Sequence, residues 1–199
     1  MTTEAGQAPA RRTRLTPDRE AKLYAAVLDE LRGAGYEAMT MDAVAARART
    51  SKATLYRQWK GKPELVAAAL RHLKPLYSAG IDTGSLRGDL LEVAHRVEHV
   101  APGDTALLAA VGHACDGHPE LGDAMRQALI EPERAVLDAM LERAVARGEI
   151  RADAKAAEFF LPMLVAALPA RKILEDRFAD AAYMTRYIDA VVLPALLNS

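Results

Sequence analysis

The sequence predicts an all-α protein, in which an N-terminal three-helix domain is followed by a C-terminal helical bundle. Apolar residues recur at three- and four-residue spacing along most of the 199-residue chain, which is the period of a helix buried on one side. Prolines, glycines and hydroxyl residues separate these stretches where helices should begin and end. The sequence shows no β-type alternation and no internal repeat.

The first helix is predicted to begin at Thr16, a good N-cap, and to end at the glycines Gly33 and Gly35. Its buried face follows from apolar residues at four-residue steps, namely Leu23, Val27 and Leu31.

Two much shorter helices are predicted next. Thr40 caps one and Ser51 caps the other, with a break at residues 49–50. Leu55 and Trp59 lie one turn apart in the second of them and should point inward. Helices this short are marginal alone, so they need the first helix to pack on. The arrangement is a helix-turn-helix, whose second short helix is shaped to enter the major groove of DNA.

Three lysines lie where helices begin. Lys52 falls in the first turn of the third predicted helix, and Lys60 and Lys62 directly precede Pro63, which starts a fourth. Because the positive end of a helix dipole disfavours a cation, an arriving phosphate explains these lysines best. The alternative is that they are simply solvated.

Residues from about Thr16 to Leu73 resemble the DNA-binding domain of the TetR family of bacterial transcriptional regulators. The run SKATLYRQWKGKPEL, from Ser51 to Leu65, matches that family's most recognisable segment almost position by position. The resemblance implies that Thr40, Tyr56 and Lys62 hold the DNA backbone. It places a second set in or beside the groove: Thr50, Ser51, Lys52, Thr54 and Arg57.

One position departs from the family's pattern. Arg49 stands where the family usually has glycine in the turn, so Arg49 either needs no positive φ or adopts one at some cost. We include Arg49 among the DNA-binding candidates as an added phosphate contact. A solvated turn residue is the alternative.

Several of these side chains also have a purely structural interpretation. Thr40 and Ser51 are caps worth roughly 1 kcal/mol each, and the ring of Tyr56 can pack on the first helix. Arg57 is the strongest candidate for reading a base edge, because a guanidinium donates twice to guanine. Thr54 can touch a thymine methyl group or a phosphate, and the sequence does not separate these roles.

The two halves of the chain differ in charge. Residues 1–74 hold 14 lysines and arginines against 8 acids, a balance of +6, and residues 75–199 hold 12 against 19, or −7. A basic head on an acidic body suits a protein that binds DNA at one end. We assign residues 1–15 to a disordered basic arm, 16–74 to the DNA-binding domain with the start of a linking fourth helix, and 75–199 to a regulatory and dimerisation domain. The arm either contacts the minor groove or is an inert tail.

The single cysteine, Cys115, excludes an internal disulfide and suits a reducing compartment. The chain opens with no charged-then-apolar leader, and no apolar run approaches the length of a membrane span. We therefore expect a cytoplasmic protein with no membrane partner.

Further helices are predicted over about 85–100, 105–115 and 180–197, with another beginning after Asp153 that Pro162 and Pro169 should kink or end. Residues 119–129 and 132–147 are predicted to form one long or interrupted helix that stops at Gly148. The last two helices are apolar on more than one face, which indicates a homodimer interface. A monomeric bundle is the alternative. The predicted interface residues are Phe160, Leu164, Leu168, Tyr183, Tyr187 and Val191.

The TetR resemblance also implies a small-molecule effector, held in a mostly apolar pocket of the body and able to release the DNA. The candidate lining residues are Leu107, Val111, His113, Met125, Leu129, Met140, Phe159 and Met163. Most of these side chains can equally be ordinary core, since Met and Phe on helix stripes usually are.

Other chemistry finds little support. His95 and His99 stand one turn apart without a third metal ligand nearby, and the looser cluster of His113, Cys115 and His118 has the same weakness. The sequence contains no phosphate-binding glycine loop, Ser–His–acid set or paired cysteines. We expect no metal, no cofactor and no enzymatic activity.

The leading hypothesis is a homodimeric repressor that binds a palindromic double-stranded DNA operator and is released by its effector. An activator, or a regulator without an effector, is the alternative within the same class. A helical enzyme or carrier is a remote alternative, because it leaves residues 40–65 unexplained.

Overall fold

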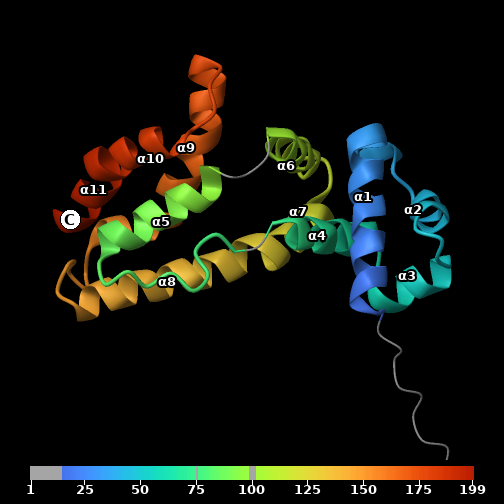
Figure 1. Ribbon diagram of the computed structural model, residues 1–199, viewed down its shortest axis with the longest axis horizontal. Coiled ribbons are helices and arrows are strands. Elements are labelled where there is room, and N and C mark those ends of the chain that lie inside the picture. The colour runs from blue at the N-terminus through green and yellow to red at the C-terminus, as the bar shows by residue number, and fades with distance from the viewer. Residues whose placement is uncertain (1–14, 75, 99–101) are drawn as a thin grey trace, which may run out of the picture.

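The computed structural model describes residues 15–74, 76–98 and 102–199. Over these residues the protein consists of helices and loops without a strand, which confirms the predicted all-α class. The molecule is elongated, with α1 to α4 at one end and α9 to α11 at the other (Figure 1). The predicted basic arm lies outside the described residues, apart from Leu15.

The N-terminal helices are α1 (Pro17–Ala38), α2 (Met41–Arg47), α3 (Lys52–Gln58) and α4 (Lys62–Leu73). They are followed by α5 (Leu86–Glu98), α6 (Pro102–Ala114), α7 (Pro119–Met125), α8 (Glu131–Ala146), α9 (Phe160–Glu175), α10 (Ala181–Tyr187) and α11 (Leu193–Leu197). Short irregular helical segments are η1 (Arg126–Ile130), η2 (Lys155–Phe159) and η3 (Ile188–Val192).

Helix ends follow the local sequence. The Ser85 hydroxyl accepts a hydrogen bond from the N–H of Gly88 at 3.1 Å, ahead of α5. The Asp180 carboxylate accepts one from the N–H of Tyr183 at 2.7 Å, ahead of α10. Gly35, with a φ of 76°, interrupts α1 before its last turn. The predicted glycine end of the first helix is therefore a kink, and a final turn follows it.

One continuous rod, formed by α7, η1 and α8, runs along most of the molecule and is about 40 Å long at 1.5 Å per residue. η1 is a π-helical segment that ends two residues before Pro132, and η3 ends two residues before Pro194. A proline donates no N–H, and its ring clashes with the carbonyl four residues earlier. A wider π turn removes that clash without ending the helix. Of the two predicted possibilities, a long or an interrupted helix, the structure has the long one, with a local widening before Pro132.

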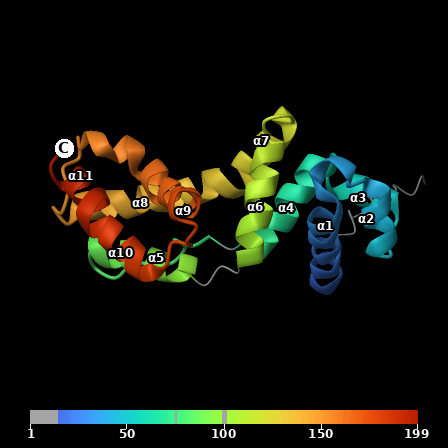
Figure 2. The same ribbon diagram turned by 90° about the horizontal axis from the view of Figure 1, so that it is seen from above.

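Two apolar cores lie along the molecule. The head core joins α1 to α4 and also takes in Leu107 and Val111 of α6 and Leu121 of α7. The distal core joins α5, the second half of α8, and α9 to α11. Figure 2 shows α6 and α7 beside α4, at the head end of the rod. The helices α6 and α7, which come after α5 in the sequence, therefore pack against the N-terminal helices and support the head.

Candidate nucleic-acid interface

The surface around α3 rests on the head core. Leu55 of α3 is fully buried, and Trp59, directly after α3, is 8% exposed. The Trp59 ring lies 6.0 Å from that of Tyr24 in α1, edge to face. These contacts support a seven-residue helix that is too short to be stable alone. The predicted inward orientation of Leu55 and Trp59 is confirmed.

The two short helices carry the predicted hydroxyl caps. The Thr40 hydroxyl accepts a hydrogen bond from the N–H of Ala43 at 3.1 Å. The Ser51 hydroxyl accepts one from the N–H of Thr54 at 3.1 Å, and the hydroxyls of Ser51 and Thr54 lie 2.8 Å apart. The capping role is confirmed for Thr40 and Ser51. It leaves room for DNA contact, because a hydroxyl oxygen has a second acceptor site.

The turn between α2 and α3 is a Schellman motif with arginine in the glycine position. The N–H of Thr50, a half-buried residue, donates to the carbonyl of Ala45 at 2.9 Å, and that of Arg49 to Ala46 at 3.2 Å. Arg49 has a φ of 51°, in the left-handed region. Of the two possibilities left open by the sequence, Arg49 adopts the positive φ, at a cost of about 1 kcal/mol.

The outer side of α3 is accessible. Lys52, Ala53 and Arg57 are exposed, Thr54 is half-buried, and Tyr56 is 48% exposed. A phenol ring exposed to this extent is not a core residue, so of its two interpretations Tyr56 fits the surface one. The face thus combines cations, a phenol and a hydroxyl, which are the groups that contact phosphates and base edges. The DNA-binding role of each residue stays a prediction.

Two of the lysines near α3 have carboxylate partners inside the protein. Lys52 Nζ lies 2.8 Å from Asp42 Oδ2, and Lys60 Nζ lies 3.3 Å from Glu64 Oε1. The hydrogen bond to Asp42 raises the pKa of Lys52, and a hydrogen bond from the backbone N–H of Lys60 lowers the pKa of Glu64. Exposed ion pairs contribute only about 0–1 kcal/mol, so a DNA phosphate can replace either carboxylate.

Lys62 has partners that the sequence did not predict. Its ammonium donates to the carbonyl of Tyr36 at 2.8 Å, to that of Met39 at 3.2 Å and to that of Glu37 at 3.5 Å. It also lies 4.1 Å from the centre of the Tyr36 ring. These carbonyls follow the kink at Gly35, so the end of α1 surrounds the start of α4. They stabilise a cation at the N-terminus of α4 without DNA, and the phosphate contact of Lys62 stays a prediction.

The predicted dimer-interface residues mostly face the protomer's own interior. Phe160 and Leu164 are only 2% and 8% exposed, inside the distal core. Leu168, Tyr183 and Tyr187 pack against that core, whereas Val191 is 42% exposed. Phe160 and Leu164 were therefore placed on the wrong side of α9. Because α9 is apolar on both sides, periodicity alone does not tell which side the chain covers by itself.

The opposite side of α9 is apolar and exposed. Pro162, Val165, Pro169 and Ile173 recur at three- and four-residue steps, and all four are exposed. Pro169 lies inside α9 without ending it. Ile173 and its neighbour Leu174 are each 80% exposed, the highest values among the large apolar side chains described.

The predicted effector-pocket residues do not line one cavity. Phe159 is 55% exposed, and the His113 side chain is 90% exposed. The head core holds or contacts Leu107, Val111, Met125 and Leu129, whereas the distal core holds or contacts Met140 and Met163. A pocket of about 330 Å³ lies between α4 and the α7–η1 segment, lined mainly by alanines together with Glu64, Arg71 and Gln127, and includes none of the predicted residues.

The described residues contain no group of three or more His, Cys, Asp or Glu that could hold a metal. The loose cluster near α7 is separated into local contacts: Cys115 donates to the carbonyl of Val111 at 3.3 Å, and His113 lies 3.6 Å from Asp116. His99 falls outside the described residues. Within the described part of the chain, no helix is both long and apolar enough to cross a membrane.

Comparison with known proteins covers both ends of the molecule. A family profile described as bacterial regulatory proteins, tetR family, matches residues 23–69. A second, described as tetracyclin repressor-like, C-terminal domain, matches residues 81–191. The chain belongs to the TetR family. The resemblance seen in residues 16–73 is confirmed, and the family extends over the C-terminal helices as well.

Individual TetR-family proteins match along most of the chain. An HTH-type transcriptional regulator of Mycobacterium tuberculosis is 34% identical over 181 residues, 91% of this chain and 89% of that protein. The DNA-binding transcriptional repressor TetR of Mycobacteroides abscessus is 34% identical over 177 residues, 88% and 92% of the two chains. The crystal structure of the TetR family regulator SCO0332 matches with a TM-score of 0.70 at 27% identity, covering 89% of this chain and 98% of that one. This TetR-family chain is therefore a DNA-binding transcriptional regulator, a class that is not an enzyme class.

Proposed function

We propose that this TetR-family regulator is a homodimeric repressor, which binds a palindromic operator through α3 and is released by a small, mostly apolar effector. The observation that carries the proposal is the exposed cationic and hydroxyl face of α3 above a complete core. The M. abscessus relative, named as a repressor, supports repression over activation. In a bacterium such a protein acts in the cytoplasm, where the DNA is.

The DNA contacts divide by chemistry. Arg57, in the last turn of α3, is proposed to donate to a guanine edge. Lys52 and Tyr56 are proposed to bind phosphates, as is the Thr40 hydroxyl, which is exposed where α2 begins.

A second protomer is proposed to cover the exposed apolar face of α9, defined by Pro162, Val165, Pro169 and Ile173, together with Leu174 at the exposed end of the helix. Apolar side chains at this exposure suit a protein partner better than water. A two-fold dimer would place two α3 helices on half-sites about 34–36 Å apart, one turn of DNA. Val191 of η3 and Phe178, between α9 and α10, are also exposed, at 42% and 47%, and are proposed to add to this interface.

The test of DNA recognition starts from a duplex selected by the wild-type protein from random sequences. Arg57→Ala should lose about 10- to 100-fold affinity for that duplex and relax the preference at one base pair. Tyr56→Phe should weaken binding by a factor that is the same for all duplexes and smaller than the loss caused by Arg57→Ala. Arg151→Ala, in an exposed loop beyond α8, is the matched control and should bind normally. Unchanged affinity in both Arg57→Ala and Tyr56→Phe contradicts the assignment of α3.

The effector is tested on the same duplex. Apolar compounds that raise the melting temperature should also release the duplex, because a ligand shifts two states only through differential affinity. The rod supports this proposal, because it packs in the distal core through α8 and in the head core through α7. Compounds that raise the melting temperature and leave DNA binding unchanged would favour an effector-independent regulator.

A further inference from the structure

Three side chains from distant segments meet where the segment that precedes α7 contacts the head. His118 directly precedes α7, Tyr36 lies in the last turn of α1, and Lys62 begins α4. The Tyr36 ring centre lies 5.0 Å from that of His118, edge to face, and 4.1 Å from Lys62 Nζ. This His118–Tyr36–Lys62 stack is a direct contact between the segment that begins the rod and the head.

A strong hydrogen bond lies beside the stack. His118 Nε2 lies 2.5 Å from Glu37 Oε1, across 81 residues of sequence, and His118 Nδ1 lies 3.3 Å from Glu120 Oε1. With a carboxylate at each ring nitrogen, both nitrogens have acceptors, which is the arrangement that a protonated imidazole satisfies. The bond joins the end of α1 to the start of α7.

Other charged and titratable groups surround the site. Burial, then the charges of Glu120, Glu37 and Cys115, raises the pKa of Tyr36 to about 12, so its ring stays neutral. Burial raises the pKa of the Cys115 thiol, which Arg126 opposes and Asp116 reinforces. Lys62 lies beyond the Tyr36 ring and is bound by α1 carbonyls. His118 is thus the group here that can change charge near neutral pH.

We propose that His118 is a positioning residue for DNA recognition: its protonated ring, held by Glu37, fixes the head against the rod, so operator affinity depends on its protonation. The proposal rests on the DNA-binding function proposed above. Neither His118 nor Glu37 belongs to the surface around α3.

The link to α3 is short. Trp59 to Gly61 are the residues between α3 and Lys62, whose ammonium is held by the end of α1. A dimer reads two half-sites at a fixed separation, so each head must keep its orientation. A head that is loosely attached has to lose that freedom when it binds, and the loss lowers affinity.

The direction of the pH effect follows from the hydrogen bond. Glu37 raises the pKa of His118 above the ordinary value of 6.5, and Glu120 adds to the effect. The stabilisation that the charged ring gives to this contact is therefore fully present below 6.5, the pKa of the detached ring, and it is lost as the pH rises through the raised value. Operator affinity should fall over the same interval.

The experiment compares four proteins at constant ionic strength between about pH 6 and 8.5, using the selected duplex. Wild-type affinity should fall about five-fold across the interval, the low end of ordinary coupling between sites. His118→Gln and Glu37→Gln should bind with little dependence on pH. His113→Gln is the matched control, because His113 has a 90% exposed side chain and an ion pair only with Asp116, and it should keep the wild-type slope.

A second readout needs no DNA. Hydrogen exchange follows the N–H of Met39, which donates to Gly35 at 3.2 Å, and that of Leu121, which donates to His118 at 3.0 Å. After correction for intrinsic rates, protection of both should fall with pH in the wild type and not in His118→Gln. If the wild type binds no duplex, the proposed function fails, and exchange alone then decides this inference.

The proposal is overturned if His118→Gln keeps the wild-type pH slope, or if His113→Gln loses it. Circular dichroism checks folding of each variant. Should His118→Gln fail to fold, Glu37→Gln decides the matter, because Glu37 is exposed and leaves the imidazole in place.

Discussion

The two ends of the molecule expose opposite kinds of side chain over equally complete cores. At the head end, the surface around α3 presents Lys52, Tyr56 and Arg57 above a buried Leu55. At the distal end, α9 presents Ile173 and Leu174, each 80% exposed. A hydrated polar surface suits a ligand that is itself charged, whereas a bare apolar one suits another protein surface. The difference supports the proposal that DNA binds at one end and a second protomer at the other.

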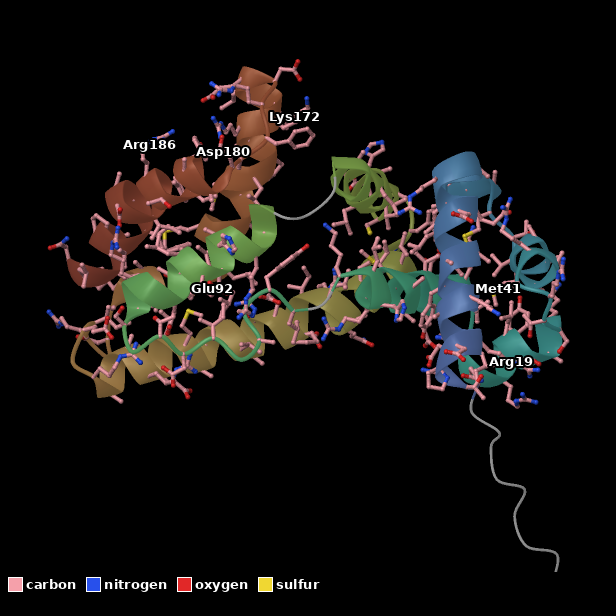
Figure 3. All side chains as sticks on the ribbon, viewed as in Figure 1. Arg19, Met41, Glu92, Lys172, Asp180 and Arg186 are labelled. Atoms are coloured by element: carbon pink, nitrogen blue, oxygen red, sulfur yellow. The ribbon has the colours of Figure 1, made fainter. Side chains whose placement is uncertain are left out.

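The distal apolar surface is exposed although its support is ordered. Arg171 of α9 is 4% exposed, donates to the carbonyl of Phe178 at 2.9 Å and lies 4.2 Å from the Tyr183 ring centre. Figure 3 shows the neighbouring Lys172 on the end of α9 that projects from the distal helices, with Asp180 beside it. The end of α9 is thus anchored on its inner side, and its outer apolar side chains are not a sign of local unfolding.

The distal apolar surface is where substitution should have the strongest consequence. The double variant Ile173→Glu with Leu174→Glu should become monomeric in analytical ultracentrifugation, because it would bury two charges in the interface. Loss of the second half-site should then weaken operator binding by about 100-fold or more. Ala135→Glu with Ala146→Glu, two exposed positions on α8, adds the same charge and should remain dimeric. A dimeric Ile173→Glu, Leu174→Glu protein would show that the partner binds elsewhere.

At the head, removal of one carboxylate should change DNA binding more modestly. Asp42→Asn removes the carboxylate that lies 2.8 Å from Lys52 Nζ, so the ammonium becomes free for a phosphate. Affinity for DNA should rise about three-fold, and its logarithmic salt dependence should steepen by roughly one unit. Asp153→Asn breaks the comparable exposed pair with Arg151, at 2.7 Å, and should change neither. Titration by fluorescence anisotropy at several salt concentrations distinguishes these results.

The smallest effect concerns two helix ends with the same hydrogen bonds. After α8, the N–H groups of Gly148 and Glu149 donate to the carbonyls of Val145 and Ala144 at 2.9 Å each. After α2, Arg49 and Thr50 make the corresponding hydrogen bonds to the end of their own helix. Gly148 has a φ of 75° without steric cost. A glycine in place of Arg49 would therefore remove the steric cost of the turn after α2.

Arg49→Gly should stabilise the protein by about 0.5–1 kcal/mol and raise the melting temperature by roughly 2–4 °C. Arg49→Ala keeps the strain and should give no such gain. If Arg49 also contacts a phosphate, both variants should weaken DNA binding equally, which calorimetry and a binding titration measure together. An equal melting temperature in all three proteins would show that the turn bears no strain.

The features that were predicted correctly from the sequence depend on residues close together in the chain. The caps at Thr40 and Ser51, the inward Leu55 and Trp59, and the family of the chain all follow from short, ordered patterns. Each depends on residues within one or two helical turns, where side-chain chemistry and helix period suffice.

Contacts between distant segments were not predictable in the same way. The partners of Lys62 lie more than 20 residues earlier and converge only because Gly35 kinks α1. The buried side of α9 was misassigned because both sides of the helix are apolar. The predicted pocket residues belong to two different cores, because an apolar stripe on a helix indicates burial but not which core the stripe joins. The sequence left open whether the helix is interrupted before Pro132, because it does not show that a π turn allows the helix to continue.

The continuous helix through both cores also has a mechanical consequence. A stiff rod about 40 Å long converts a tilt of about five degrees at one end into a displacement of about 3.5 Å at the other. That displacement is close to the spacing of roughly 3.4 Å between successive phosphates along the axis of one DNA strand. A barely visible rearrangement among the last helices is therefore enough, by leverage alone, to carry a reading head one base pair out of step with its site.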